Sequence, residues 1–165
     1  MLDHLEQLLA EYRKKGVLVD TNLLLLYVVG IQTPNRIQRF SRTDTFTEDD
    51  FDLLSRFLTP FETAVTTPSI LTEVSNLLGQ LPKQPRRECT TLFRDLIREL
   101  DDVYRDAEAI CDHPYFIRFR LTDAGIADVS DDAYLVLTDD LPLYHRLAED
   151  QQAVINFNHL RTANW

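Results

Sequence analysis

The longest apolar run in the chain lies within residues 14–30 (KKGVLVDTNLLLLYVVG), and the polar triplet Asp20-Thr21-Asn22 interrupts it. Burying a carboxylate in such a segment is costly unless a hydrogen bond or an opposite charge compensates for it. The VLV sequence before the triplet is typical of a short buried strand, and the Leu-rich residues after it suit a helix. The run therefore predicts a strand at 17–19 and a helix over 23–29, with Asp20 at their junction.

Short apolar runs alternate with helical patterns along the rest of the chain. We expect further strands at 64–66, 134–137 and 153–157, and helices at 2–13, 48 or 49 to 58, 68–79, 88–100, 122–129 and 141–149. Residues 81–87 read as a Pro-rich loop, 104–120 as helical at first and irregular around His113-Pro114, and 31–48 receive no assignment. The alternation predicts an α/β fold with a central, mainly parallel sheet flanked by helices.

The composition is that of one folded globular domain. The chain has 165 residues, 44% hydrophobic and 27% charged, so we expect a single domain over 1–165, with an N-terminal helix in 1–15 and a core at about 16–157. No stretch reaches about 18 uninterrupted apolar residues, so we expect no membrane span. The N-terminus lacks the basic start and apolar block of a signal peptide, and two cysteines, Cys89 and Cys111, fit a reducing compartment. A cytoplasmic location is expected.

The formal net charge of -10 argues against a protein held to nucleic acid by its overall charge. It does not exclude a nuclease, because negative charge can be concentrated in a metal site and neutralised there by cations. Two basic groups are candidate contacts for RNA phosphate: Arg36, Arg39 and Arg42 in the first, and Lys83, Arg86 and Arg87 in the second. The alternative for each group is an ordinary solvated surface.

Carboxylates occur near the points where the predicted strands end and the following helices begin. Asp20 ends the first strand, and Asp139 and Asp140 follow the strand at 134–137. Glu73 lies one turn inside the helix after the strand at 64–66, and Asp123 lies in the first turn of a short helix. In open α/β sheets, ligands bind outside the carboxyl ends of the strands.

Acids that gather at one edge repel one another, and Mg²⁺ or Mn²⁺ relieves the repulsion because both ions prefer oxygen ligands. Ions of this kind can activate water and stabilise the leaving oxygen when a phosphodiester is cleaved. The pattern therefore predicts metal-dependent hydrolysis of a phosphate ester.

Each acid also has a simpler explanation. Asp20 and one of Asp139 and Asp140 could cap the helices that follow them, Glu73 could be a solvated helix residue, and Asp123 could be favoured by the helix dipole. The T-x-D spacing favours Asp140 over Asp139 as the ligand. We interpret three further acids as a solvated turn, although the first could face the site: Asp128, Asp131 and Asp132. His113 and His145 have no second histidine or cysteine at metal-ligand spacing.

Four segments together resemble the PIN-domain family of nucleases across about residues 16–157. They are VLVDTNLLL, TTPSILTEVSNLL, LTDAGI and LVLTDDLPLYHRL, in the order and spacing of the family pattern. The resemblance implies a three-layer PIN-like fold in which four acids bind Mg²⁺ or Mn²⁺: Asp20, Glu73, Asp123 and Asp140. Asn22 and Thr138 correspond to polar positions that support these acids, and Asp139 is placed with them.

The resemblance also implies an activity, which is endonucleolytic cleavage of single-stranded RNA. Many bacterial members of the family are the toxins of toxin–antitoxin pairs, so an antitoxin protein and a homodimer are expected partners. The alternative is a non-catalytic PIN-like binding module or an RNA-processing subunit. Divalent-ion binding by the purified protein separates the catalytic reading from the non-catalytic one.

Overall fold

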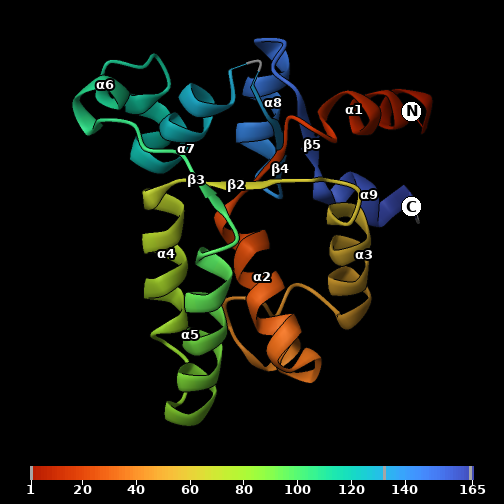
Figure 1. Ribbon diagram of the computed structural model, residues 1–165, viewed down its shortest axis with the longest axis vertical. Coiled ribbons are helices and arrows are strands. Elements are labelled where there is room, and N and C mark those ends of the chain that lie inside the picture. Colours follow the sequence, from red (N-terminus) through yellow and green to blue (C-terminus); the bar gives the residue numbers. More distant parts are fainter. Residues whose placement is uncertain (1, 132, 164) are drawn as a thin grey trace.

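The computed structural model describes residues 2–131, 133–163 and 165 and shows an α/β fold built on one parallel sheet (Figure 1). In the described residues the sheet has five strands in the order β3-β2-β1-β4-β5, and every neighbouring pair is parallel. The strands are β1 (Val17–Val19), β2 (Ala64–Thr66), β3 (Asp101–Asp102), β4 (Leu135–Thr138) and β5 (Val154–Asn156). The prediction of an α/β fold with a parallel sheet is confirmed.

Helices cover both faces of the sheet and give three layers. One layer holds α2 (Thr21–Gln32), α3 (Glu48–Leu58), α4 (Pro68–Leu78) and α5 (Lys83–Ile97), and a short 3-10 helix, η1 (Pro34–Arg39), follows α2. The opposite layer holds α6 (Ala107–Cys111), α7 (Phe116–Ser130) and α8 (Leu141–Glu149). The first and last helices, α1 (Leu2–Tyr12) and α9 (Phe157–Ala163), lie on the same side of the molecule in Figure 1.

Helix α2 is the centre of its layer, because α3, α4 and α5 all pack against it (Figure 1). A helix that is apolar on all sides can be stable only where every side is covered. The run of leucines from Leu23 to Leu26 is almost completely buried, as are Val28, Val29 and Gly30. The second half of the apolar run in the sequence is therefore this buried helix, and the first half is the central strand β1.

Gly30 lets α3 approach α2 closely. A Cβ atom at this position would lie 2.2 Å from Cδ2 of Phe51 and 2.5 Å from its Cγ, well inside van der Waals contact. The ring of Phe51 also lies 6.2 Å from that of Tyr27, centroid to centroid, so both aromatic side chains stand at this helix–helix contact. The Phe51 ring thus occupies the space that a side chain at position 30 would need.

Several predicted boundaries were wrong; the helix predicted over 88–100, for example, ends at Ile97. Helix α5 begins at Lys83, inside the predicted Pro-rich loop, because Pro85 falls in its first turn, where a helix needs no backbone N–H donor. The last strand ends at Asn156 rather than 157, and Phe157 instead begins α9. Residues 116–119 are helical, whereas the sequence predicted an irregular segment there.

The predicted helix over 122–129 lies in the second part of α7, after a sharp break. Arg120 interrupts the helix with φ 68° and ψ -171°, a backbone region that essentially only glycine adopts without strain. Holding another residue there costs about 1–3 kcal/mol. The break turns the chain so that Thr122 and Asp123 start a new helical segment.

The described residues include no helix that is both long enough and apolar enough to cross a membrane.

Replacing Gly30 by alanine should destabilise the protein by about 1–2 kcal/mol, although alanine is the better helix former by about 1 kcal/mol. The new methyl group would overlap the Phe51 ring, and the ring can move only by disturbing the contact between α2 and α3. The measurement is the urea midpoint of unfolding. The matched control is Gly125→Ala, whose Cβ would meet only Cδ1 of Ile110 at 3.5 Å and which should not destabilise. Equal midpoints for the two variants would contradict the prediction.

Candidate functional site

The strand order places one edge of the sheet at a topological switch point. The chain moves from β1 to β2 and β3 on one side, and then returns to β4 and β5 on the other side of β1. At such a point the connections leave in opposite directions and a crevice opens at the carboxyl ends of the strands. Asp20 follows β1, and Asp139 and Asp140 follow β4, so these acids flank the switch point.

A cavity of 310 Å³ lies beside these strand ends. Its walls are Asp20, Thr21, Asn22, Glu73, Asn76, Leu77, Asp123 and Asp140. The four acids predicted from the sequence thus line one cavity, although they come from four separate segments of the chain. Asn22, predicted as a supporting residue, also lines it.

Asp20 is buried, with 7% of its surface exposed, and its carboxylate is held on both oxygens. The Thr21 backbone N–H donates to Oδ1 at 2.7 Å, and the Thr138 hydroxyl donates to Oδ2 at 2.6 Å. The residue also stands at the N-cap of α2. The two explanations of Asp20, a helix cap and a cavity residue, therefore hold together.

Two threonines hold Glu73, which projects from α4. The Thr21 hydroxyl donates to Oε2 at 2.9 Å, and the Thr122 hydroxyl donates to Oε1 at 2.7 Å. Glu73 thereby joins α4 to α2 and α7 across the cavity. Sequence reasoning did not assign this role to Thr21 or Thr122, although each stands next to a predicted acid in the chain.

The two acids after β4 have different surroundings. Asp140 caps α8 by accepting from the Leu143 N–H at 2.7 Å, and its own N–H donates to the Thr138 hydroxyl oxygen at 3.0 Å. Asp139 accepts from the Asn22 amide at 3.3 Å and is not part of the cavity wall. The structure therefore places Asp140 in the cavity and Asp139 beside it, as the T-x-D spacing favours.

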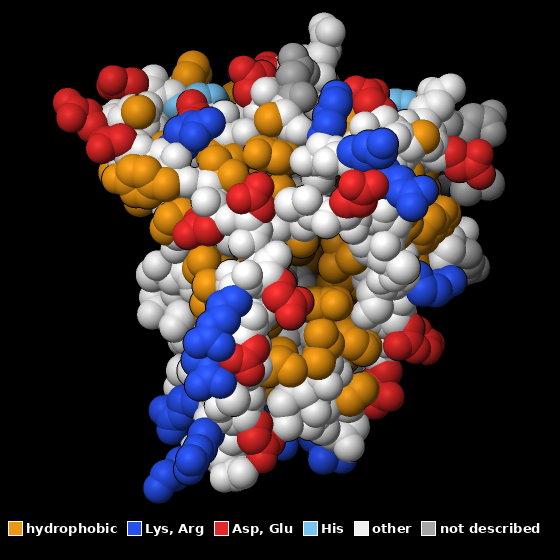
Figure 2. All heavy atoms as spheres, viewed as in Figure 1, with side chains coloured by type: hydrophobic (Ala, Val, Ile, Leu, Met, Phe, Trp, Pro, Cys, Tyr) orange, Lys and Arg blue, Asp and Glu red, His pale blue; other side chains and the backbone are white. Residues whose placement is uncertain are grey.

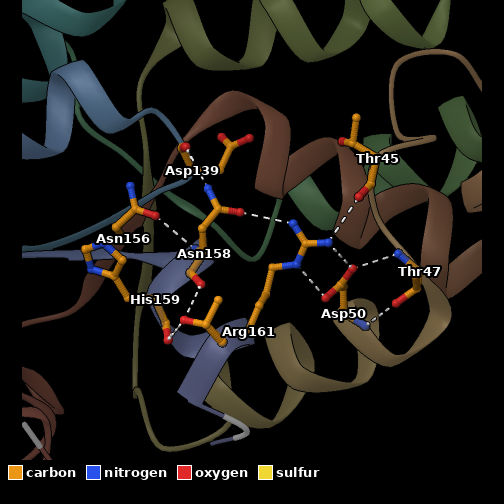
Figure 3. Close-up of polar contacts among 9 residues, drawn as sticks. Thr45, Thr47, Asp50, Asp139, Asn156, Asn158, His159 and Arg161 are labelled. Atoms are coloured by element: carbon orange, nitrogen blue, oxygen red, sulfur yellow. Dashed lines mark hydrogen bonds and ion pairs between the residues drawn. The ribbon is translucent and has the colours of Figure 1, made fainter.

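Helix α9 supports the Asp139–Asp140 turn from outside the cavity (Figure 3). The Asn158 amide donates to the Asp139 carbonyl at 3.1 Å, and Arg161 donates to Asn158 Oδ1 at 3.0 Å. Arg161 also binds Asp50 of α3 through both carboxylate oxygens, at 2.7 and 2.9 Å, and donates to the Thr45 carbonyl. The turn is thus connected to α3 through one arginine.

Two of the cavity acids, Asp20 and Asp123, are harder to ionise than an ordinary aspartate. Burial raises the pKa of Asp20 to about 6, with smaller contributions from Asp139 and Asp140 and opposition from the hydrogen bonds of Thr138 and Thr21. Burial also raises the pKa of Asp123 to about 7, helped by the charges of Asp20, Asp140 and Glu73. The electrostatics fit a site that gains from a positive charge.

Carboxylate oxygens are the donors that Mg²⁺ and Mn²⁺ prefer, so the lining fits a hard divalent cation by its chemistry and charge. No three His, Cys, Asp or Glu side chains of the described residues are already grouped closely enough to hold a metal ion. The carboxylates of Asp20 and Glu73 instead accept from threonine hydroxyls. The donor set is present, and its current contacts are with protein groups.

The predicted basic groups lie near the far end of α4. Arg42 donates to Gln80 Oε1 at 2.7 Å and Arg86 donates to the Gly79 carbonyl at 3.3 Å, just past the helix terminus. This end is about 9 Å along the helix from Glu73. Arg39 and Arg87 are exposed, whereas Arg36 is half-buried and its Nε has no hydrogen-bond partner among the described residues.

A longer basic stripe runs along α5. Lys83, Arg87, Arg94 and Arg98 recur at spacings of four and seven residues, so they share one face of the helix, and all four are exposed. Figure 2 shows this stripe as a blue column over the region of α4 and α5. Asp95 pairs with Arg94 and Arg98 at 2.9 and 3.3 Å. The sequence predictions included only the first part of the stripe.

The other acids considered as candidates do not join the cavity wall. Asp128 pairs with Arg105 at 3.1 Å, which accounts for its carboxylate without a metal. Asp131 is exposed at the end of α7. Asp132 lies outside the described residues.

When a chelator keeps the protein free of metal, the contribution of Asp20 and Asp123 to its free energy of unfolding should fall as the pH rises from about 5 to about 8. Their raised pKa values mean that the folded state binds protons more tightly than the unfolded state, so this stability is lost as the pH passes the folded pKa. For Asp20, a pKa of about 6 instead of 3.8 corresponds to about 3 kcal/mol against the charged form.

Asp20→Asn should therefore stabilise the metal-free protein at about pH 8 by about 1–2 kcal/mol, because lost hydrogen bonds offset about 1 kcal/mol of the relief. Urea unfolding at about pH 5 and pH 8 measures this, with the exposed Asp44→Asn as control. A residue that served only as a helix cap would instead give a loss of stability at both pH values.

A scan of the chain against models of known protein families found no match, and neither did a search of curated proteins. The resemblance to PIN-domain nucleases therefore stays a prediction that rests on the four sequence segments.

Proposed function

We propose that the protein is a PIN-like, Mg²⁺- or Mn²⁺-dependent endoribonuclease that cleaves single-stranded RNA. The observation that carries the proposal is the gathering of Asp20, Glu73, Asp123 and Asp140 in one cavity at the carboxyl edge of the sheet. Asp20 is buried and Asp123 is half-buried, and the charges of the neighbouring acids raise the pKa of both, so placing these acids together costs stability and needs a compensating use. A divalent cation is that use.

The four acids would hold the cation, which when bound stabilises negative charge on phosphate oxygens and activates water. The protein groups around them keep the acids in place. Thr138 and the Thr21 N–H orient the Asp20 carboxylate, and the hydroxyls of Thr21 and Thr122 orient Glu73. Asp140 is fixed at the start of α8 by its hydrogen bond with Leu143. These hydrogen bonds hold the carboxylates at the cavity wall, and the carboxylates would draw closer together around a bound cation.

The basic stripe on α5 supports a long anionic substrate rather than a small phosphate ester. It adjoins a cleft of 570 Å³ between α4 and α5, which Arg94 and Arg98 line together with Thr72 and Asn76. Asn76 also lines the acidic cavity, so an RNA strand bound along the basic stripe would reach the acids by crossing α4. Phosphate contacts of this kind position a nucleic acid without reading its sequence.

The wider role that we propose follows the resemblance. The activity would be that of a cytoplasmic toxin restrained by an antitoxin protein, with a homodimer as the expected assembly. An RNA-processing subunit uses the same chemistry without the antitoxin. A non-catalytic PIN-like module is the competing function, and it leaves the raised pKa values of Asp20 and Asp123 without a use.

The purified protein should cleave single-stranded RNA in Mn²⁺ or Mg²⁺, and Asp20→Asn, Asp140→Asn or chelator should reduce the rate at least about a hundredfold. The measurement is the cleavage of an end-labelled oligonucleotide on a denaturing gel. Asp139→Asn is the matched control, because it alters the neighbouring carboxylate outside the cavity wall, and it should cost about tenfold or less.

Robust cleavage by Asp20→Asn, after contaminating nucleases are removed, would overturn the site assignment. Calorimetric titration with Mn²⁺ separates the competing function. Heat of binding that disappears in Asp140→Asn supports the metal site, whereas no heat and no cleavage by the unaltered protein favour the non-catalytic module.

A further inference from the structure

A second cavity, of 740 Å³, adjoins the acidic cavity and shares Glu73 and Asp123 with it. One wall comes from the start of α4, with Pro68, Ser69 and Thr72, and the other comes from α7. The shared acids join the two cavities, so the larger one forms a groove between α4 and α7 that leads to the acids.

Arg120 lies in the wall of this groove, three residues before Asp123. Its side chain is exposed and makes no hydrogen bond or ion pair with other described residues. Although burial and the other acids raise the pKa of Asp123, the positive charge of Arg120 acts in the opposite direction. Arg120 is thus a cation near the acids whose hydrogen-bond donors remain available to a ligand.

The backbone at Arg120 adds a second observation. Its φ of 68° and ψ of -171° belong to a region that suits glycine, yet the chain carries a long cationic side chain there. Strained residues of this kind persist where the surrounding fold enforces them, and they cluster at sites that bind ligands. A glycine would relieve the strain but would remove the charge from the groove.

We propose that Arg120 binds a phosphate group of the RNA strand in the groove, next to the bond that the acids cleave. The inference rests on the proposed ribonuclease function and deepens it. A guanidinium presents its N–H donors in a planar fork that matches two phosphate oxygens. It also offsets the repulsion that the acids exert on an approaching phosphate. The strained turn holds this one cation at the groove wall beside them.

The test compares Arg120→Gly, Arg120→Gln and Arg120→Lys in steady-state cleavage of a labelled single-stranded RNA over a range of salt concentrations. The glycine and glutamine variants should raise KM about tenfold, because they remove a charge-assisted contact. They should also lower the dependence of log KM on log salt by about one, the amount expected for one lost phosphate contact. The lysine variant should keep the salt dependence and recover part of the affinity.

Thermal melting separates binding from a structural role. Arg120→Gly should melt at or above the temperature of the unaltered protein, since glycine relieves the strain, while it still loses affinity. Arg118→Gln is the matched control. It removes the same charge two residues before Arg120, and the Arg118 side chain is not part of the groove wall, so the KM of this variant should stay unchanged.

Unchanged KM and salt dependence in Arg120→Gln, with the unaltered protein cleaving RNA normally, would overturn this inference and leave the proposed function intact. A lower melting temperature in both neutral variants with an unchanged salt dependence would also overturn it, because Arg120 would then hold the helix break rather than a phosphate. If the unaltered protein neither binds nor cleaves RNA, the proposed function and this inference fail together.

Discussion

The rest of the structure depends on the burial of one carboxylate, that of Asp20. The residue stands between the central strand of the sheet and the most deeply buried helix, so the chain cannot expose it without exposing both. Its charge is tolerated because Thr138 and the Thr21 N–H satisfy both oxygens. The neighbouring acids add repulsion that these two bonds do not remove, and this unrelieved repulsion is the physical basis for proposing a cation.

The carboxylates also explain why threonines are the residues that hold Asp20 and Glu73 in place. A hydroxyl can donate to a carboxylate and still accept from a backbone N–H, and Thr138 does both between Asp20 and Asp140. Thr21 likewise uses its N–H for Asp20 and its hydroxyl for Glu73. Such neutral partners hold the acids without cancelling their charge. A lysine or arginine in the same places would have neutralised them and removed the attraction for a metal.

The elements that the sequence predicted well are those whose burial leaves a regular pattern. The strands at residues 17–19 and 64–66, and the acids Asp20 and Asp140, were identifiable because apolar runs end in polar residues at the sheet edge. Glu73 and Asp123 lie inside helices, and their assignment depended on the resemblance to the PIN-domain pattern. Strand β3 left no such signal, since Asp101 and Asp102 are exposed and join the sheet through backbone pairing alone. Helix α9 was hidden because Phe157 continues the apolar strand pattern before it. The strain at Arg120 was equally invisible, because a residue type does not reveal the sign of φ.

Basic side chains gather locally on one helix of a protein whose net charge is negative. The chain carries a net charge of -10, yet one face of α5 presents four basic side chains in a row. Long-range repulsion from the acidic surface leaves this stripe as a favourable approach for an anionic strand, most strongly at low salt. An acidic protein can thus admit nucleic acid from one direction while it disfavours contact elsewhere.

The hydrogen bond between Thr138 and Asp20 joins residues that are 118 positions apart in the chain. Strands β1 and β4 must also pair before the cavity can exist, so its formation depends on contacts between residues that are distant in sequence, and such contacts form slowly. A growing chain on the ribosome carries the VDTN segment early, but it cannot assemble the acidic cavity until the segment through residue 140 has emerged. The topology therefore delays assembly of the site until most of the chain has been synthesised, and incomplete chains lack the assembled site.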